Sequence, residues 1–346
     1  NMKRTSMLLS LLGLFFIPLS AWAGEQTRPQ FLIKFATVAP EGSTWMKQME
    51  VLDRRVRKES DGRLGFTFYA GGVAGDEMDV LRRIRIGQIH CAAFSGVGFG
   101  QILPLLRVLD LPFLFQNDAE TDRVHRELRP FFAEKLKQKG FVLLSWAEVG
   151  DVHLFSKTPV TRVEDLAGLK VWAWSGDPIA KETFMAMGVN PVPLAITDVT
   201  TALNTGMIDT VYGPPLGALA LQWQAYVRYM MALPLVHSTG ALLISSRYFQ
   251  KLPQDLARIL TGSTERAMAE LTAELREQNQ EARKILQESG VDITPAPQGK
   301  ALERFHAIGA QVAAKLAGEV YPRALLDRVY AILKRDHQAE SSHGHP

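Results

Sequence analysis

Residues 31–94 read FLIKFATVAPEGSTWMKQMEVLDRRVRKESDGRLGFTFYAGGVAGDEMDVLRRIRIGQIHCAAF. Three apolar stretches in this segment are typical of strands, at residues 31–37, 64–68 and 89–94. Between the first two, Trp45, Met49, Leu52 and Val56 recur at helical spacing after a capping Ser43. A second helix is expected from about residue 76 to 86. The order strand, helix, strand, helix, strand predicts an α/β protein with a mostly parallel sheet and helices on its faces.

A second α/β unit follows after Pro159. Residues 170–174 are typical of a strand, and Asp177 with Pro178 is a strong helix start because Asp caps free amides and Pro suits the first turn. Another helix is expected to start at Thr197 or Asp198 and end at Gly206, before a strand at 207–212. The sequence therefore predicts two α/β lobes.

One long polar helix is expected over residues 262–290. At about 1.5 Å per residue it would reach roughly 40 Å. Its narrow apolar stripe consists of Met268, Leu271, Leu275, Ala282 and Ile285, interrupted by Gln278. The stripe fits a helix that lies across both lobes, and the seam of a coiled-coil dimer is the alternative.

The chain has 346 residues, of which 47% are hydrophobic and 22% charged, with a formal net charge of +3. This composition is typical of a globular protein, and the length favours two domains. No dense basic run is present, which argues against a nucleic-acid partner. Cys91 is the only cysteine, so neither an internal disulfide nor a cysteine metal cluster is possible.

Residues 1–23 are typical of a signal peptide. Lys3 and Arg4 precede an apolar run, residues 7–17, that is too short to span a bilayer as a helix. The small residues around Trp22 fit a cleavage site near Ala23. We expect an exported periplasmic protein, with a retained signal anchor as the alternative. The polar residues 337–346 are expected to form a flexible tail.

Catalytic motifs are missing from the sequence. It has no G-x-S-x-G elbow, no H-E-x-x-H and no Walker lysine loop. The glycine-rich segment 71–75 is interpreted as a strand-to-helix turn, and segment 96–100 as backbone room beside a cleft. We expect a binding protein without a cofactor or a protein-held metal, and an inert buried thiol at Cys91.

Four further segments resemble one family. Residues 112–115 are PFLF after a Leu- and Pro-rich stretch. Residues 165–171, DLAGLKV, resemble D-L-x-G-L-K-[IV]-R; residues 187–193, MGVNPVP, resemble L-G-A-x-P-x-P; and residues 205–209, TGMID, resemble T-G-x-[IV]-D. In this order they are similar to the DctP-type substrate-binding proteins of TRAP transporters, and the resemblance covers nearly the whole chain after residue 23.

This resemblance implies a two-lobed periplasmic binding protein fold with a long helix contacting both lobes. Lobe 1 would comprise residues 24–150 with parts of 235–336, and lobe 2 residues 151–234. The implied partners are a small-molecule ligand and the membrane permease subunits of a TRAP transporter. Two alternatives stay open: a periplasmic enzyme acting in the cleft, and a ligand-sensing adaptor for a signalling or helical-repeat partner.

Three positions depart from the family pattern. Trp172 stands where the family has a carboxylate-binding arginine, Val152 replaces a second common arginine, and Gly213 replaces the asparagine of a frequent Glu-Asn-Pro element. Neither Trp nor Val can pair with a planar carboxylate as Arg does. The departures predict a cavity that favours apolar or aromatic ligands. A monocarboxylate held by backbone amides or Tyr212 remains open, as does a metal that bridges the ligand.

The candidate ligand-binding residues are mostly aromatic: Trp172, Trp174, Tyr212, Phe94 and Trp223, with Gly213 beside them. The candidate polar anchors are Glu77, His153 and His237, together with Gln222; core packing is the alternative role for each. Side chains alternate along a strand, so Trp172 and Trp174 should share the cavity face. On this hypothesis Trp172→Arg weakens ligand binding more than tenfold and leaves thermal stability nearly intact.

Overall fold

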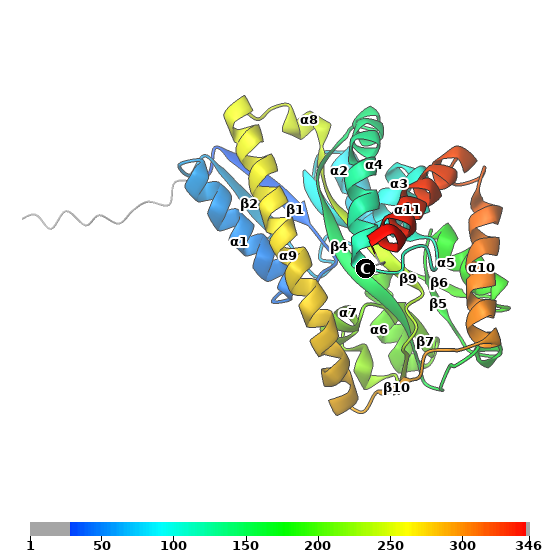
Figure 1. Ribbon diagram of the computed structural model, residues 1–346. Coiled ribbons are helices and arrows are strands. Elements are labelled where there is room, and N and C mark those ends of the chain that lie inside the picture. The colour runs from blue at the N-terminus through cyan, green and yellow to red at the C-terminus, as the bar shows by residue number, and fades with distance from the viewer. Residues whose placement is uncertain (1–27, 344–346) are drawn as a thin grey trace, which may run out of the picture.

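The computed structural model describes residues 28–343, with side chains to residue 335. The expected signal peptide lies outside these residues. The N-terminal segment forms the predicted order: β1 (Phe31–Ala36), α1 (Thr44–Glu59), β2 (Leu64–Tyr69), α2 (Glu77–Arg85) and β3 (Cys91–Ser95). The α/β prediction is confirmed, and Figure 1 shows the strands enclosed by helices.

The remaining elements complete two lobes. Those before the second unit are α3 (Gly96–Ile102), the 3-10 helix η1 (Pro104–Asp110), α4 (Asp118–Gln138) and β4 (Phe141–Ser156). The second unit contains η2 (Val163–Leu166), β5 (Trp172–Trp174), α5 (Pro178–Ala186), β6 (Val192–Leu194), α6 (Ile196–Thr205), β7 (Thr210–Gly213), α7 (Pro215–Ala220), η3 (Trp223–Ala225) and β8 (Tyr229–Met231). The chain then forms β9 (Val236–Ser245), α8 (Ser246–Phe249), α9 (Gln254–Glu288), β10 (Asp292–Thr294), α10 (Lys300–Leu316) and α11 (Arg323–His343).

The main sheet is mixed, which corrects the prediction of a mostly parallel one. Its order is β10-β8-β4-β9-β3-β1-β2, with β7 also paired to β4. The pairs of β1 with β2 and β3 are parallel, as expected, but β9 runs antiparallel to both β3 and β4. The first part of β4 pairs with β9 and its last residues pair with β7 and β8. This long strand therefore crosses from lobe 1 to lobe 2.

A bulge bends β4 at the crossing. The register with β9 shifts between Glu148 and Gly150. Gly150 has a φ of +104°, a conformation that L side chains rarely adopt, and a Cβ there would lie 2.9 Å from the amide nitrogen of Asn279. A glycine is therefore required where β4 passes α9.

Local signals explain the helix boundaries. The Ser43 side chain accepts a hydrogen bond from the Met46 amide at 3.4 Å and starts α1. Asp177 caps α5 through a 2.9 Å hydrogen bond from the Ile179 amide. Gly206, with a φ of +72°, ends α6. These three signals were readable from the sequence.

Helix α9 lies along both lobes, as expected, although it starts at Gln254 and not near residue 262. It packs on α1 and β4 in lobe 1 and on α7 in lobe 2; Figure 1 shows it along one side of the molecule. Met268, Leu271, Leu275 and Ala282 are buried against the lobes. Gln278, which interrupts the stripe, accepts a hydrogen bond from the Thr44 hydroxyl. Ile285, the last residue of the predicted stripe, is instead 48% exposed. The rest of the stripe is covered within the chain, which favours the interlobe interpretation over a dimer seam.

The C-terminal helix α11 continues to His343 and so includes most of residues 337–346, which we expected to be a flexible tail. Residues 344–346 lie outside the described part. Between residues 28 and 343, no helix is long and apolar enough to cross a membrane. Cys91 is fully buried in the core beneath α1, and burial raises the pKa of its thiol.

Candidate ligand cavity

A cavity of about 550 Å³ lies between the two lobes. Such a volume suits a small organic molecule. Lobe 1 contributes residues from β3, α3 and η1, lobe 2 contributes β5, α5, β7 and α7, and α9 adds Leu275 and Asn279. The structure brings seven of the candidate residues to this cavity: Glu77, Phe94, Trp172, Trp174, Tyr212, Gly213 and Trp223.

An aromatic cluster forms the lobe 2 wall. The Trp172 and Tyr212 rings stack with centroids 4.7 Å apart, and Trp223 meets Trp172 edge-on at 5.9 Å. Gly213 lets Trp223 approach, since a Cβ at Gly213 would lie 3.0 Å from that ring. The lobe 2 wall is therefore built of aromatic rings at the positions that the sequence indicated.

Trp172 is also part of the core. It is 1% exposed, and its indole nitrogen donates a 3.0 Å hydrogen bond to the Leu194 carbonyl. An arginine at this position would bury an unpaired charge and lose both the stack and the hydrogen bond. The expectation that Trp172→Arg leaves thermal stability intact is therefore revised.

Trp174 shares the cavity with Trp172, with ring centroids 6.0 Å apart. Its indole nitrogen donates to Asp76 Oδ2 at 2.9 Å. Its backbone nitrogen donates to the Tyr212 hydroxyl at 3.0 Å. Trp174 thus connects the cavity wall of lobe 2 to the start of α2 in lobe 1.

Glu77 lies in the lobe 1 wall and is 2% exposed. Its carboxylate accepts hydrogen bonds from the Ser95 amide at 2.7 Å, the Ser95 hydroxyl at 2.9 Å and the Gly98 amide at 2.7 Å. Burial raises the pKa of Glu77 to about 7 against the effect of these bonds. Its hydrogen bonds join α2 to β3 and α3, so it supports the wall.

A buried ion-pair cluster in the cavity was missed by the sequence analysis. Arg107 donates one Nη to Asp110 and the other to Asp177, the latter at 2.6 Å. Asp110 Oδ1 also accepts the Thr239 amide at 2.9 Å. Arg107 and Asp110 belong to η1, whereas Asp177 caps α5, so the cluster spans the lobes. The only sequence signal was a charged pair three residues apart inside an apolar stretch.

The glycines of α3 make room for this cluster. A Cβ at Gly96 would lie 1.7 Å from Asp110 Oδ2, and one at Gly100 would lie 2.4 Å from the Arg107 side chain. The predicted backbone room beside a cleft therefore serves buried charged side chains. Burial raises the pKa of Asp110 to about 6, although Arg107 acts to lower it.

His153 and His237 are not among the described residues that line the cavity. Val152 lines it and His153 follows on the opposite face of β4, where its ring bonds the Met231 carbonyl at 2.9 Å. His237 lies between Val236 and Ser238, which line the cavity from β9. Strand alternation turns both histidines away.

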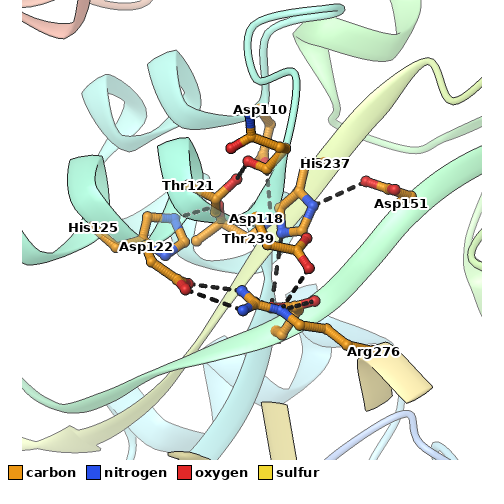
Figure 2. A network of polar contacts seen from close by, with 11 residues as sticks. Asp110, Asp118, Thr121, Asp122, His125, Asp151, His237, Thr239 and Arg276 are labelled. Carbon is orange, nitrogen blue, oxygen red and sulfur yellow. Dashed lines mark hydrogen bonds and ion pairs between the residues drawn. The ribbon is translucent and has the colours of Figure 1, made fainter. Parts of the chain in front are cut away.

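His237 belongs to a polar network beside the bulge of β4, which Figure 2 shows. Its Nδ1 lies 3.0 Å from Asp151 Oδ1. Burial acts to lower the pKa of His237, but Asp151 and Glu148 raise it above its usual value. Arg276 of α9 pairs with Asp122 and Glu148, each at 2.7 Å, and with Asp118 at 3.3 Å.

Asp118, Glu148 and His237 place ligand atoms within 4.8 Å of one another. A metal ion there would compete with Arg276, which already pairs with both carboxylates. Arg276 thus takes the place that a metal ion would occupy, and the network joins α9 to α4, β4 and β9.

Comparison with protein families gives a match over most of the chain. The model of the bacterial extracellular solute-binding proteins, family 7, matches residues 35–318. A solute-binding protein of Chromohalobacter salexigens is 32% identical over 165 residues, which are 47% of this chain and 49% of the relative. The C4-dicarboxylate-binding periplasmic protein DctP of Rhodobacter capsulatus is 24% identical over 75% of this chain and 78% of the relative.

Solved structures share the fold. The sugar acid binding protein DctPAm of Advenella mimigardefordensis, in complex with galactonate, has a TM-score of 0.84 at 22% identity, covering 89% of this chain and 99% of that one. DctP7 of Bordetella pertussis, which binds pyroglutamic acid, has a TM-score of 0.81 at 19% identity over 88% of this chain and 99% of that one. At these identities the likeness establishes the two-lobed fold alone.

Proposed function

Because this chain belongs to family 7 of the bacterial extracellular solute-binding proteins, we propose that it captures a small organic ligand with an apolar or aromatic body. It is a solute-binding protein of the TRAP transporter type and not an enzyme, and proteins of this type work with membrane permease components. The ligand's character is the part that we add to the family's function.

The observation that carries the proposal is the aromatic wall. Trp172 stands where the family motif has its arginine, and it stacks on Tyr212 inside the cavity wall. A ligand that buries roughly 250 Å² of apolar surface gains about 6 kcal/mol at ~25 cal/mol per Å², before immobilisation costs. Micromolar binding needs about 8 kcal/mol, so one or two polar contacts would complete it.

A monocarboxylate is the less favoured ligand. The only arginine in the described cavity wall, Arg107, already pairs with two carboxylates. The acids bound by the solved relatives therefore do not transfer to this chain. Near the aromatic wall, backbone amides and the Tyr212 hydroxyl could donate to such a ligand, and the exposed Lys47 lies in the wall of lobe 1.

We further propose cleavage of a signal peptide near Ala23 and function in the periplasm, where the DctP relative acts. A helical-repeat partner gains no support from the described surface, and we do not propose one. The ligand-sensing adaptor alternative would share the cavity and differ only in the partner.

The test is native mass spectrometry of the protein as purified, followed by Trp fluorescence titration with any ligand that is released. We expect one small molecule per chain, with an aromatic or aliphatic body, whose mass is unchanged after incubation with the protein. A ligand that consists of a polar dicarboxylate or sugar acid would contradict the proposal. Conversion of the ligand to another compound would contradict the assignment as a binding protein.

A further inference from the structure

We propose that Asp177 sets the charge preference of the cavity, so that it accepts ligands whose apolar or aromatic body carries a protonated amine and rejects the matching carboxylates. This inference rests on the proposed function and narrows its ligand class. It gives Asp177, which the sequence indicated as a helix cap, a second role in ligand selection.

Asp177 has one carboxylate oxygen that is not hydrogen-bonded within the described part of the chain. Its Oδ1 accepts hydrogen bonds from the Ile179 amide at 2.9 Å and from Arg107 Nη2 at 2.6 Å. Its Oδ2 accepts none from any residue that the structure describes. The residue is 7% exposed and lines the cavity. Asp177 therefore occupies the guanidinium and leaves one carboxylate oxygen for a ligand donor.

The buried part of the cavity wall carries more carboxyl groups than cations. Its ionisable side chains, among the described residues, are Lys47, Glu77, Arg107, Asp110, Asp177 and Tyr212. Lys47 is exposed on α1, so the buried part holds one cation and three carboxyl groups. Even with Glu77 protonated, the carboxylates of Asp110 and Asp177 outnumber the single guanidinium of Arg107, so the buried part keeps a net negative charge of one.

These charges decide between ligand classes. In the buried part of the cavity, a ligand carboxylate would add a negative charge where the one cation, Arg107, already pairs with two carboxylates, at a cost of several kcal/mol. Arg107 Nε has no partner among the described residues but is buried, and the two Nη groups pair with Asp110 and Asp177. A ligand carboxylate that paired with Nη2 would displace Asp177, which would then be buried without its partner. A ligand ammonium would instead neutralise the excess charge and could donate to the unoccupied Oδ2 of Asp177.

The test uses three probes with one aromatic body: 2-phenylethylamine, 2-phenylethanol and phenylacetate. Dissociation constants are measured by calorimetry at pH 7. We expect the wild-type protein to bind the amine at least tenfold more tightly than phenylacetate, with the alcohol between them. In Asp177→Asn, which keeps the capping oxygen but removes the charge, the amine-to-carboxylate preference should fall at least tenfold.

Two further variants make the result specific. Asp198→Asn removes an equal charge from the exposed first turn of α6 and should keep the wild-type preference. Asp177→Ser also retains a capping oxygen and serves if Asp177→Asn does not fold; it should show the same loss.

Three outcomes would overturn the inference: equal or tighter binding of phenylacetate by the wild type, an unchanged preference in both Asp177 variants, or no binding of any probe at millimolar concentration. The proposed function is judged separately, by the ligand that the purified protein releases. An apolar ligand without an amine would uphold that proposal and reject this inference.

Discussion

The indole nitrogen of Trp174 lies 2.9 Å from Asp76 Oδ2, so β5 of lobe 2 is hydrogen-bonded to the N-cap of α2 in lobe 1. Gln101 adds a second interlobe bond, from its amide nitrogen to the Gly176 carbonyl at 2.8 Å. Burial raises the pKa of Asp76, although the bond from Trp174 acts to lower it. The lobes are thus held together by polar contacts that need no ligand.

Trp174→Phe should weaken this closure. The variant keeps an aromatic ring but loses the donor to Asp76, a bond to a charged group worth about 1.5–3 kcal/mol. We expect a larger radius of gyration for the ligand-free variant in small-angle X-ray scattering, because open forms gain population.

Trp223→Phe is the matched control for Trp174→Phe. Its indole nitrogen is buried and has no hydrogen-bond partner among the described residues, so the same substitution removes ring area without removing a bond. An equal increase in radius of gyration for both variants would contradict a specific role for the Trp174 to Asp76 hydrogen bond.

Trp172→Arg should now lower both ligand affinity and stability. Truncating a buried Trp costs about 3–5 kcal/mol, and the buried guanidinium adds to this. Urea denaturation should therefore give a midpoint well below that of Trp172→Phe, which loses only the bond to Leu194 and part of the stack. A midpoint close to wild type would show that Trp172 packs less tightly than its 1% exposure indicates.

The first lobe was predictable because its signals are local. Ser43, Asp76 and Gly87 mark helix ends, and the apolar stretches between them alternate or repeat within a few residues. The mixed sheet was not predictable in this way. Its β4 and β9 strands pair across about 90 residues of sequence, and nothing in either segment specifies an antiparallel partner.

The cavity was predictable where a motif fixed the strand register, as at Trp172 and Tyr212. It was not predictable where only the fold joins distant residues: Arg107 meets Asp177 across 70 positions. The prediction that His153 and His237 line the cavity was wrong for a different reason. Each lies one residue from a cavity-lining neighbour, and strand alternation turns each away from the cavity.

His125 should make stability depend on pH. Its ring is bonded to the Thr239 hydroxyl at 2.9 Å and stacks on Trp146 at 5.1 Å. Burial lowers the pKa of His125 from 6.5 to about 3. Below pH 6.5 the unfolded chain binds a proton that the folded protein excludes, so the stability contributed by neutral His125 is present above pH 6.5 and lost as pH falls toward 3.

The measurement compares the wild type with His125→Gln by urea unfolding at pH 7, 6 and 5. The wild type should lose about 2 kcal/mol more than the variant between pH 7 and 5, at ~1.4 kcal/mol per pH unit below 6.5. Glu77 acts in the opposite direction, since its raised pKa favours the folded state at lower pH, but its contribution cancels in the difference. Parallel pH profiles would exclude a buried neutral His125.

Two glycine substitutions in helices should have opposite effects. Gly96→Ala places a Cβ 1.7 Å from Asp110 Oδ2 and 2.0 Å from Arg107 Nη1, so the ion pair must move or α3 must shift. Overpacking of this kind costs about 1–3 kcal/mol.

Gly262→Ala lies within α9, where the nearest atom would be 3.6 Å away, and should gain about 0.5–1 kcal/mol from the higher helix propensity of alanine. A change of about 1 kcal/mol shifts the melting temperature of a chain this size by roughly 2–4 °C. Scanning calorimetry should therefore give a lower melting temperature than wild type for Gly96→Ala and a higher one for Gly262→Ala. A Gly96→Ala protein as stable as Gly262→Ala would mean that α3 does not pack closely on the Arg107 to Asp110 pair.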